Sequence, residues 1–331
     1  MKKPSVSAPS CSRRTESRRH WAQINEVSFI GGMRLLFGVY RLLGRAPFRL
    51  LLYPVLLWYM ARNARARAAS IDYLEHVQRH RPALKMATGL WGALRHFAAF
   101  GESLLDKMLL WGRLFPLERI GTSGDTAILE ANARGQGGLM ICTHLGNLEL
   151  CRVLAHHQAR IRLTVLVHTK HARAFNQLLA QLDPNSQLNL MQVTEMTPAT
   201  AVLLAEKVAR GEFVVIAGDR VPVAPNPRVA MAPFMGQAAP FPVGPYVLAS
   251  LLQCPVYLMF SRRTRDGAEV CFENFRQQIQ LPRKQRAQLL DELVADYAAR
   301  LEHHCLQAPL QWFNFYDFWA LPIFDSDHAP H

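Results

Sequence analysis

The chain has 331 residues, of which 50% are hydrophobic and 19% are charged, and this is enough to bury one large α/β core with an appendage. Residues 1–67 hold thirteen Lys and Arg against two Glu, so they carry +11 of the formal net charge of +13. This uneven charge argues against a nucleic-acid-binding protein, because such a protein carries its positive charge on the folded face that contacts phosphate.

The N-terminal part is predicted to divide in two. Residues 1–20 are polar and rich in Ser, Lys and Arg, without the apolar stretch of a secretory signal, and we expect a disordered basic tail. Residues 21–66 are expected to form a membrane-associating helical segment, because basic residues beside apolar ones suit anionic lipid. Six scattered cysteines without a Cys-x-x-Cys pair predict neither disulfides nor a zinc site, and favour a cytoplasm-facing protein.

The membrane expectation depends on one apolar run, residues 50–60, which lies between Arg49 and Arg62. The run is shorter than the about 18 apolar residues of a membrane span, and it contains Pro54. We therefore expect helices that lie in the membrane interface, with arginine side chains reaching the headgroups. A tilted span over about residues 46–61 and a soluble core helix are the alternatives.

Residues 67–325 are predicted to form the main folded domain. Its first part, 71–113, is expected to be helical with a break near Pro82. Beyond it, short apolar runs alternate with helical patterns, which predicts a mostly parallel sheet flanked by helices. The expected strands are 138–143, 161–167, 188–193, 212–217 and 254–260, with an antiparallel edge strand at 268–275, and the expected helices are 147–157, 171–182, 197–210, 244–252 and 283–305.

The most informative feature is the motif His144-Leu145-Gly146-Asn147-Leu148-Glu149, between an apolar strand and a helical pattern. Residues five apart lie about 140° apart on an ideal helix. His144 and Glu149 therefore meet only if the histidine is still in the turn and the glutamate is already in the helix. Gly146 permits the backbone to make that turn.

Such a pair suits acyl transfer to an alcohol. Glu149 would hold one imidazole nitrogen, and the other nitrogen of His144 would take a proton from a hydroxyl nucleophile. Backbone amides at the start of the following helix would bind an oxyanion, and Asn147 is expected to contact substrate. The alternative is a histidine that caps a helix beside an incidental glutamate.

Asp219 and Arg220 follow the apolar run 212–217, so they are expected at the carboxyl end of a strand, where open α/β sheets build their sites. Arg220 is predicted to contact a donor or acceptor phosphate, with Asp219 orienting it. A surface ion pair between them is the alternative.

Three blocks in order carry a resemblance to a known family: the motif 144–149, the segment 211–220 ending in Gly-Asp-Arg, and the segment 233–245 with Phe-Met-Gly and a Pro-Val-Gly-Pro helix start. Over about residues 21–319 the chain resembles the late lipid A acyltransferases, the lauroyl and myristoyl transferases of the lysophospholipid acyltransferase superfamily. Two positions depart from that family. It usually has Trp where this chain has Leu148, and Gln where this chain has Arg220, which leaves the acceptor open.

The resemblance implies a membrane-associated O-acyltransferase that acts by direct transfer, without a metal, a cofactor or an acyl-enzyme. We expect the donor to be acyl carrier protein or acyl-CoA and the acceptor a hydroxyl on a lipid or glycolipid, with His144 as general base and Glu149 orienting it. A membrane-bound glycosyltransferase and a non-catalytic lipid-binding protein are the alternatives.

Two further clusters of side chains are not expected to form a site. The pair His303-His304 lacks a second pair of ligands at metal spacing, so no metal is expected there. The aromatic run from Trp312 to Trp319 is expected to cap the core, with contact to the membrane interface as the alternative.

Overall fold

The computed structural model describes residues 38, 40–111, 114–150, 161–167, 188–192, 197–222 and 227–320. The predicted tail 1–20, most of residues 21–39, the predicted helix 171–182 and most of the predicted helix 147–157 lie outside these residues.

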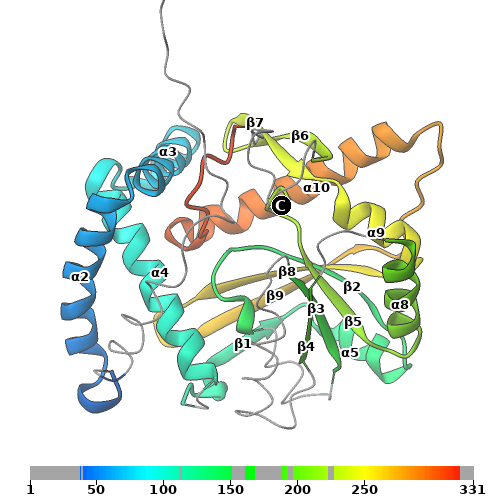
Figure 1. The fold of residues 1–331 in the computed structure, drawn as a ribbon, viewed down its shortest axis with the longest axis horizontal. Helices are drawn as coiled ribbons and strands as arrows, with labels where there is room; N and C mark the ends of the chain where they lie inside the picture. The colour runs from blue at the N-terminus through cyan, green and yellow to red at the C-terminus, as the bar shows by residue number, and fades with distance from the viewer. Residues whose placement is uncertain are drawn as a thin grey trace, which may run out of the picture.

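A seven-stranded sheet forms the centre of the described part of the chain (Figure 1). Its strands lie in the order β1-β9-β8-β2-β5-β3-β4, with bounds β1 Ile120–Ser123, β2 Gly138–Cys142, β3 Leu163–Val167, β4 Leu188–Gln192, β5 Phe213–Ala217, β8 Val256–Arg263 and β9 Ala268–Arg276. All neighbouring pairs are parallel except β8 and β9. The predicted mostly parallel sheet flanked by helices is confirmed.

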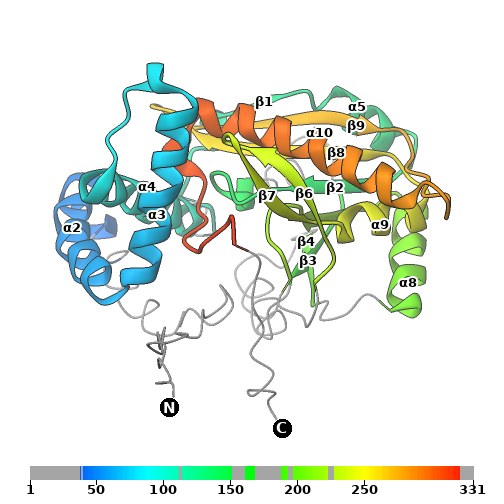
Figure 2. The same ribbon diagram turned by 90° about the horizontal axis from the view of Figure 1, so that it is seen from above.

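The two faces of the sheet are buried by different elements. The helices are α2 Arg45–Arg62, α3 Ala64–His80, α4 Gly89–Trp111, α5 Thr126–Ala133, α8 Pro198–Ala209, α9 Gly244–Leu252 and α10 Arg286–Gln307, and a hairpin is formed by β6 Val229–Phe234 and β7 Gln237–Pro242. In β2, Leu139 and Ile141 belong to the core under α9, α10 and the hairpin, whereas Met140 and Cys142 belong to the core with α2, α4 and α5. Figures 1 and 2 show α10 and the hairpin on one side of the sheet, with α5 beyond its other side.

One strand prediction needs correction. Residues 268–276 pair antiparallel with β8 as expected, but they do not form an edge, because β1 pairs with their other side in parallel register, Ile120 opposite Ala268. Only four residues make β1, and their burial alternates between intermediate and exposed. So short a strand gives no apolar run, which explains why the sequence did not indicate it.

The helices α2, α3 and α4 pack together at one end of the sheet (Figure 2). Helix α2 buries Phe48, Leu52, Leu56 and Met60, one residue per turn, against the rest of the fold. Two carboxylates of α4, Glu102 and Asp106, are at most 10% exposed and form ion pairs with Arg45 and Arg49 of α2 and with Arg263 of β8. The network therefore ties the end of the basic N-terminal segment to the sheet.

Within the described residues, no helix combines the length and the apolar character that a membrane crossing requires.

The aromatic run after α10 caps the core, as predicted. Trp312, Phe313 and Phe318 are each at most 6% exposed. Trp312 lies between Tyr73 of α3 and Phe234 of β6, with ring centroids 5.1 Å away from each. The end of the described chain thus returns to the middle of the fold, next to the carboxyl ends of β2 and β5.

Candidate active site

The candidate site lies where the central strands β2 and β5 end. In this parallel pair Cys142 is opposite Ala217, the last residue of each strand. His144 and Asp219 each come two residues later, so the strand register alone places them across from one another. This corner is the carboxyl edge of the parallel strands, where open α/β sheets place their sites.

Asp219 holds His144 through both of its carboxylate oxygens. The ring nitrogen Nδ1 of His144 lies 2.7 Å from Oδ1, and the backbone N–H of His144 donates to Oδ2 at 2.7 Å. The indole Nε1–H of Trp312 also donates to Oδ2, at 3.0 Å. Because Asp219 is fully buried and its ionised carboxylate only accepts hydrogen bonds, Nδ1 is the donor and carries the proton.

The electrostatics of the pair favour a neutral imidazole beside an ionised carboxylate. Burial is the largest cause that lowers the pKa of His144 below its ordinary 6.5; the positive charge of Arg220 lowers it further, and Asp219 acts in the opposite direction. Burial alone would raise the pKa of Asp219, but the charge and hydrogen bonds of His144 lower it below 3.8. A neutral imidazole with its proton on Nδ1 presents Nε2 as a base.

The other carboxylate of the motif has a different partner. Oε1 of Glu149 forms an ion pair with Nζ of Lys107 of α4 at 3.4 Å, and Glu149 lies in a short 3-10 turn, Leu148–Leu150. The sequence predicted that Glu149 holds one ring nitrogen of His144, but the structure puts Asp219 on Nδ1. The reason is the strand register, which brings the residue after β5 next to the residue after β2.

Asn147 organises this turn. Its side-chain Oδ1 accepts the backbone N–H of Glu149 at 3.0 Å. The other end of the amide, Nδ2, is buried and has no hydrogen-bond partner among the described residues. An unsatisfied buried donor is rare and costs free energy. Nδ2 is therefore a candidate hydrogen-bond donor to a ligand oxygen or a water.

The segment 311–313 holds the motif from the other side. Gly146 N–H donates to the carbonyl of Gln311 at 2.8 Å, and Phe313 N–H donates to the carbonyl of His144 at 3.0 Å. This short antiparallel bridge fixes the backbone on either side of Leu145, whose side chain is 1% exposed. The histidine therefore stands on a backbone held by hydrogen bonds to two other segments.

Arg220 lies beside the pair and contacts the same C-terminal segment. Its Nε donates to Oδ1 of Asn314 at 3.1 Å, and its Nη2 donates to the carbonyl of Phe313 at 2.9 Å. Asp219 was predicted to orient Arg220 toward a phosphate, but the described contacts of the Asp219 side chain are with His144 and Trp312. We infer that burial removes Asp219 itself from contact with substrate.

A cavity of about 480 Å³ opens beside the motif. Gly146, Asn147 and Leu150 line it from the motif, and the apolar side chains of Phe115, Leu310 and Phe313 line it from other elements. Arg49, Arg263 and Arg265 also line the cavity, and so does Asp106, whose carboxylate pairs with Arg263. Its size falls in the usual range of small-molecule sites, and its mixed lining suits a molecule with an apolar part and a polar part.

The sequence carried a signal for the Asp219 partnership. His144 comes two residues after Cys142, the last apolar residue of its run, and Asp219 comes two residues after Ala217, the last of the other. Parallel strands align such positions. The contribution of Trp312 had no comparable signal, because it arises from a bridge between segments far apart in the chain.

The comparison with protein-family models gives one match. Residues 117–320 match the family described as bacterial lipid A biosynthesis acyltransferase, which is more than half of the chain and includes the whole of the corner described above. No curated protein sequence matches the chain.

Gly146 is expected to be essential for the stability of the motif. Its φ is +66°, and a Cβ there would lie 2.3 Å from the carbonyl oxygen of Ser261. We expect Gly146→Ala to lower the free energy of unfolding by about 2–4 kcal/mol, from strain in the left-handed region and from the clash. The control is Gly135→Ala, with φ +69° and open space, which should cost only about 1 kcal/mol. Equal losses in urea denaturation would contradict the close approach.

Proposed function

Because the chain belongs to the bacterial lipid A biosynthesis acyltransferase family, we propose that it moves a fatty acyl chain from an acyl thioester to a hydroxyl of a lipid or glycolipid, with His144 as general base. The donor is proposed to be acyl carrier protein or acyl-CoA. The observation that carries the mechanism is the pair of hydrogen bonds between His144 and the buried Asp219. Family membership supports the acyltransferase activity on lipid, and the geometry of the pair supports the roles of the residues.

The proposed reaction is a direct transfer. The acceptor oxygen attacks the thioester carbonyl as its proton passes to Nε2 of His144, and a tetrahedral intermediate forms. The carbon–sulfur bond then breaks, and the imidazolium returns the proton to the leaving thiolate. Asp219 remains ionised throughout; it fixes the tautomer with the proton on Nδ1 and stabilises the transient imidazolium.

Glu149 is proposed to act through Lys107. The two side chains form an ion pair at 3.4 Å, and the charge of Lys107 is near enough to lower the pKa of His144. The Lys107 ammonium is thus a cation close to the reacting histidine, suited to stabilise the oxygen that becomes negative in the intermediate. Glu149 would then position Lys107, and the motif would contribute a base and a positioning carboxylate.

Substrate contacts are proposed for Asn147 and Arg220. The buried Nδ2 of Asn147, which has no described partner, is beside the cavity, and it would donate to a carbonyl or phosphate oxygen. Arg220 has two donors engaged with the segment 313–314, which holds its guanidinium next to the histidine. A guanidinium held this way suits an anionic group of donor or acceptor.

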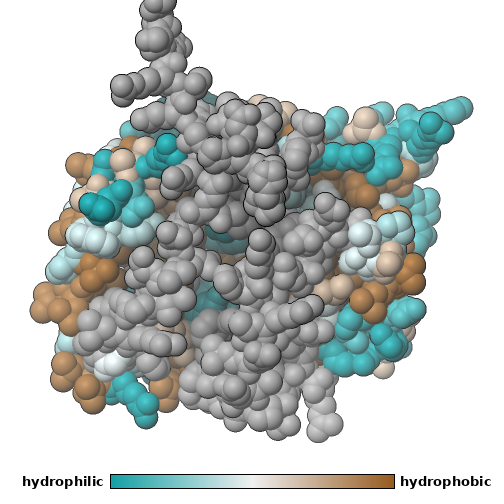
Figure 3. All heavy atoms as spheres, in the orientation of Figure 1, coloured by the Kyte–Doolittle hydropathy of each residue, from teal (hydrophilic) through white to brown (hydrophobic). Residues whose placement is uncertain are grey.

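Attachment to the membrane surface is proposed for residues 21–66, with residues 67–325 as the acyltransferase domain. On the side of α2 that faces away from α4, Leu50, Leu57 and Trp58 are 54–75% exposed, although the opposite side of the helix is buried. A helix that is apolar on both sides needs an apolar partner for the second one. Hydrophobic residues follow the α2 edge of the molecule in Figure 3. With the basic charge of the N-terminal part, this supports an interfacial helix on the cytoplasmic face of the inner membrane.

The two carboxylates are expected to differ sharply when each is changed to its amide. We expect Asp219→Asn to lower kcat about 10³- to 10⁴-fold, close to the effect of His144→Ala. An asparagine has one acceptor oxygen for three donors, and its NH₂ would force the proton from Nδ1 to Nε2. Glu149→Gln should cost about tenfold or less, because it changes only the partner of Lys107. The measurement is acyl transfer from purified acyl carrier protein or acyl-CoA thioester to a lipid acceptor.

Circular dichroism of each variant checks that it is folded. The opposite ranking, with Glu149→Gln as damaging as His144→Ala and Asp219→Asn mild, would restore the pairing of His144 with Glu149 expected from the sequence. If His144→Ala retained the turnover of the wild type, the general-base mechanism would be excluded.

The pH profile is expected to report the lowered pKa of His144. Transfer requires the neutral imidazole, so kcat/KM should be high above the pKa and fall below it, with a midpoint under 6.5 because burial and Arg220 lower the pKa. Arg220→Gln should move this midpoint upward, because a positive charge is lost, whereas Arg220→Lys should leave it in place. An unchanged midpoint in Arg220→Gln would contradict the electrostatic coupling.

The outer side of α2 is expected to bind membranes. Replacing Leu50, Leu57 and Trp58 by Ser should weaken binding to vesicles that contain anionic lipid, measured by co-sedimentation, about 100-fold or more, because each residue loses about 1–2 kcal/mol of apolar burial. The control is Val202→Ser with Leu203→Ser on α8, a second pair of exposed apolar residues, which should bind as the wild type does. Binding should persist at high salt. A protein that does not bind these vesicles at low salt would refute the proposal.

A further inference from the structure

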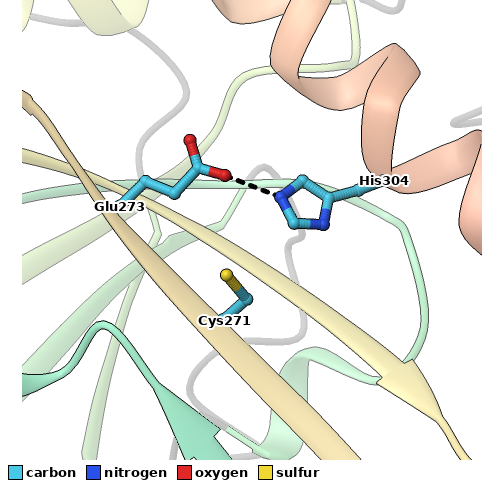
Figure 4. Close-up of side chains that lie close together, drawn as sticks. All are labelled: Cys271, Glu273 and His304. Atoms are coloured by element: carbon cyan, nitrogen blue, oxygen red, sulfur yellow. Dashed lines mark hydrogen bonds and ion pairs between the residues drawn. The ribbon is translucent and has the colours of Figure 1, made fainter.

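Among the described residues, one group of three potential metal ligands comes together, and it includes neither His144 nor Asp219. Cys271 and Glu273 are two residues apart on β9, so their side chains leave the same face of the sheet. Helix α10 covers that face and brings His304 to them (Figure 4). One ligand atom of each residue lies within 4.8 Å of the other two.

The surroundings fix the directions of these side chains. The ring of His304 stacks on Phe260, with centroids 4.0 Å apart and an interplanar angle of 20°. Its Nε2 lies 2.7 Å from Oε1 of Glu273. The second carboxylate oxygen, Oε2, accepts from Nη1 of Arg300 at 2.8 Å, and Asp296 accepts from Nε of the same arginine at 3.0 Å.

Outer groups that orient the inner ligands are a feature of metal sites. Arg300 holds Oε2 of Glu273, and the negative charge of Asp296 offsets the arginine's positive charge. The other oxygen, Oε1, faces Nε2 of His304, and an ion bound there would take the place of this hydrogen bond.

We propose that Cys271, Glu273 and His304 bind one divalent transition-metal ion of the zinc type, through Sγ, Oε1 and Nε2. Thiolate, carboxylate and imidazole are the ligands that Zn²⁺ combines, with a tetrahedral arrangement and a water in the fourth position. The ion would replace the proton that Nε2 shares with Glu273. Two ligand atoms about 2.1 Å from a tetrahedral ion are about 3.4 Å apart, so the contact between Nε2 and Oε1 must open by about 0.7 Å, which side-chain rotation can supply.

The ion would join α10 to strand β9 of the sheet. The same helix carries Tyr297, whose hydroxyl donates to the carbonyl of Cys142 at 3.2 Å, at the end of β2. Metal binding would therefore stabilise the support of His144 and take no part in acyl transfer. The proposal is independent of the chemistry assigned to His144.

The test uses the full-length protein, freed of metal with a chelator and titrated with Co²⁺ and then with Zn²⁺. We expect one equivalent of Co²⁺ to produce the near-ultraviolet absorption of a thiolate–cobalt bond, and Zn²⁺ to displace it. Zn²⁺ should also raise the Tm. Cys271→Ser should abolish the absorption and weaken Zn²⁺ binding by at least about 100-fold, more than the loss of an outer partner. Cys254→Ser, at a buried cysteine outside the cluster, should retain both.

A second matched pair separates the neighbouring histidines. His304→Gln should lose the site, whereas His303→Gln should keep it, because His303 contacts Gln307 at the surface. For the wild type itself, Zn²⁺ should protect Cys271 from alkylation, located by mass spectrometry. Absence of the cobalt absorption in the folded wild type would overturn the proposal. Persistence of the absorption in Cys271→Ser, or no protection of Cys271, would also overturn it.

Discussion

The candidate active site depends on one buried carboxylate, that of Asp219. It accepts three hydrogen bonds, two from His144 and one from Trp312, and so joins the ends of β2 and β5 to the segment after α10. A fully buried carboxylate is costly without such donors, and here each donor also positions a part of the site. The carboxylate of Asp219 therefore fixes the tautomer of His144 and also binds the C-terminal segment to the sheet through Trp312.

Helix α2 is apolar on two opposite sides. One side packs on α4, and the other side carries exposed Leu and Trp side chains. The ion pairs of Arg45 and Arg49 with the buried Glu102 and Asp106 give the helix a fixed orientation on α4. Apolar contacts alone would allow rotation of a helix that is apolar on both sides. The arginines thus decide which side of α2 remains exposed.

The sequence predicted the parts of the fold whose signals are local. The strand 212–217 and the helix 244–252 appear nearly as predicted. A continuous apolar run is enough to indicate the strand, and the Pro-Val-Gly-Pro start is enough to indicate the helix. The strand β1 was missed because four half-exposed residues follow no pattern. The turn indicates His144, but local spacing indicates Glu149 as its partner, because both residues lie within one six-residue motif. Register across the sheet decides that partner, and the packing of α10 on the sheet brings His304 to Cys271 and Glu273 across many intervening residues.

The bridge between the motif and residues 311–313 also has a consequence for biosynthesis. Trp312 reaches a carboxylate 93 residues earlier in the chain, and it belongs to a segment that leaves the ribosome after all seven strands. Domains begin to fold from their N-terminal part during synthesis, so the sheet and helices α2 to α4 precede the segment that completes the supports of the imidazole. The ring of His144 is therefore fully fixed only after the last aromatic residues dock.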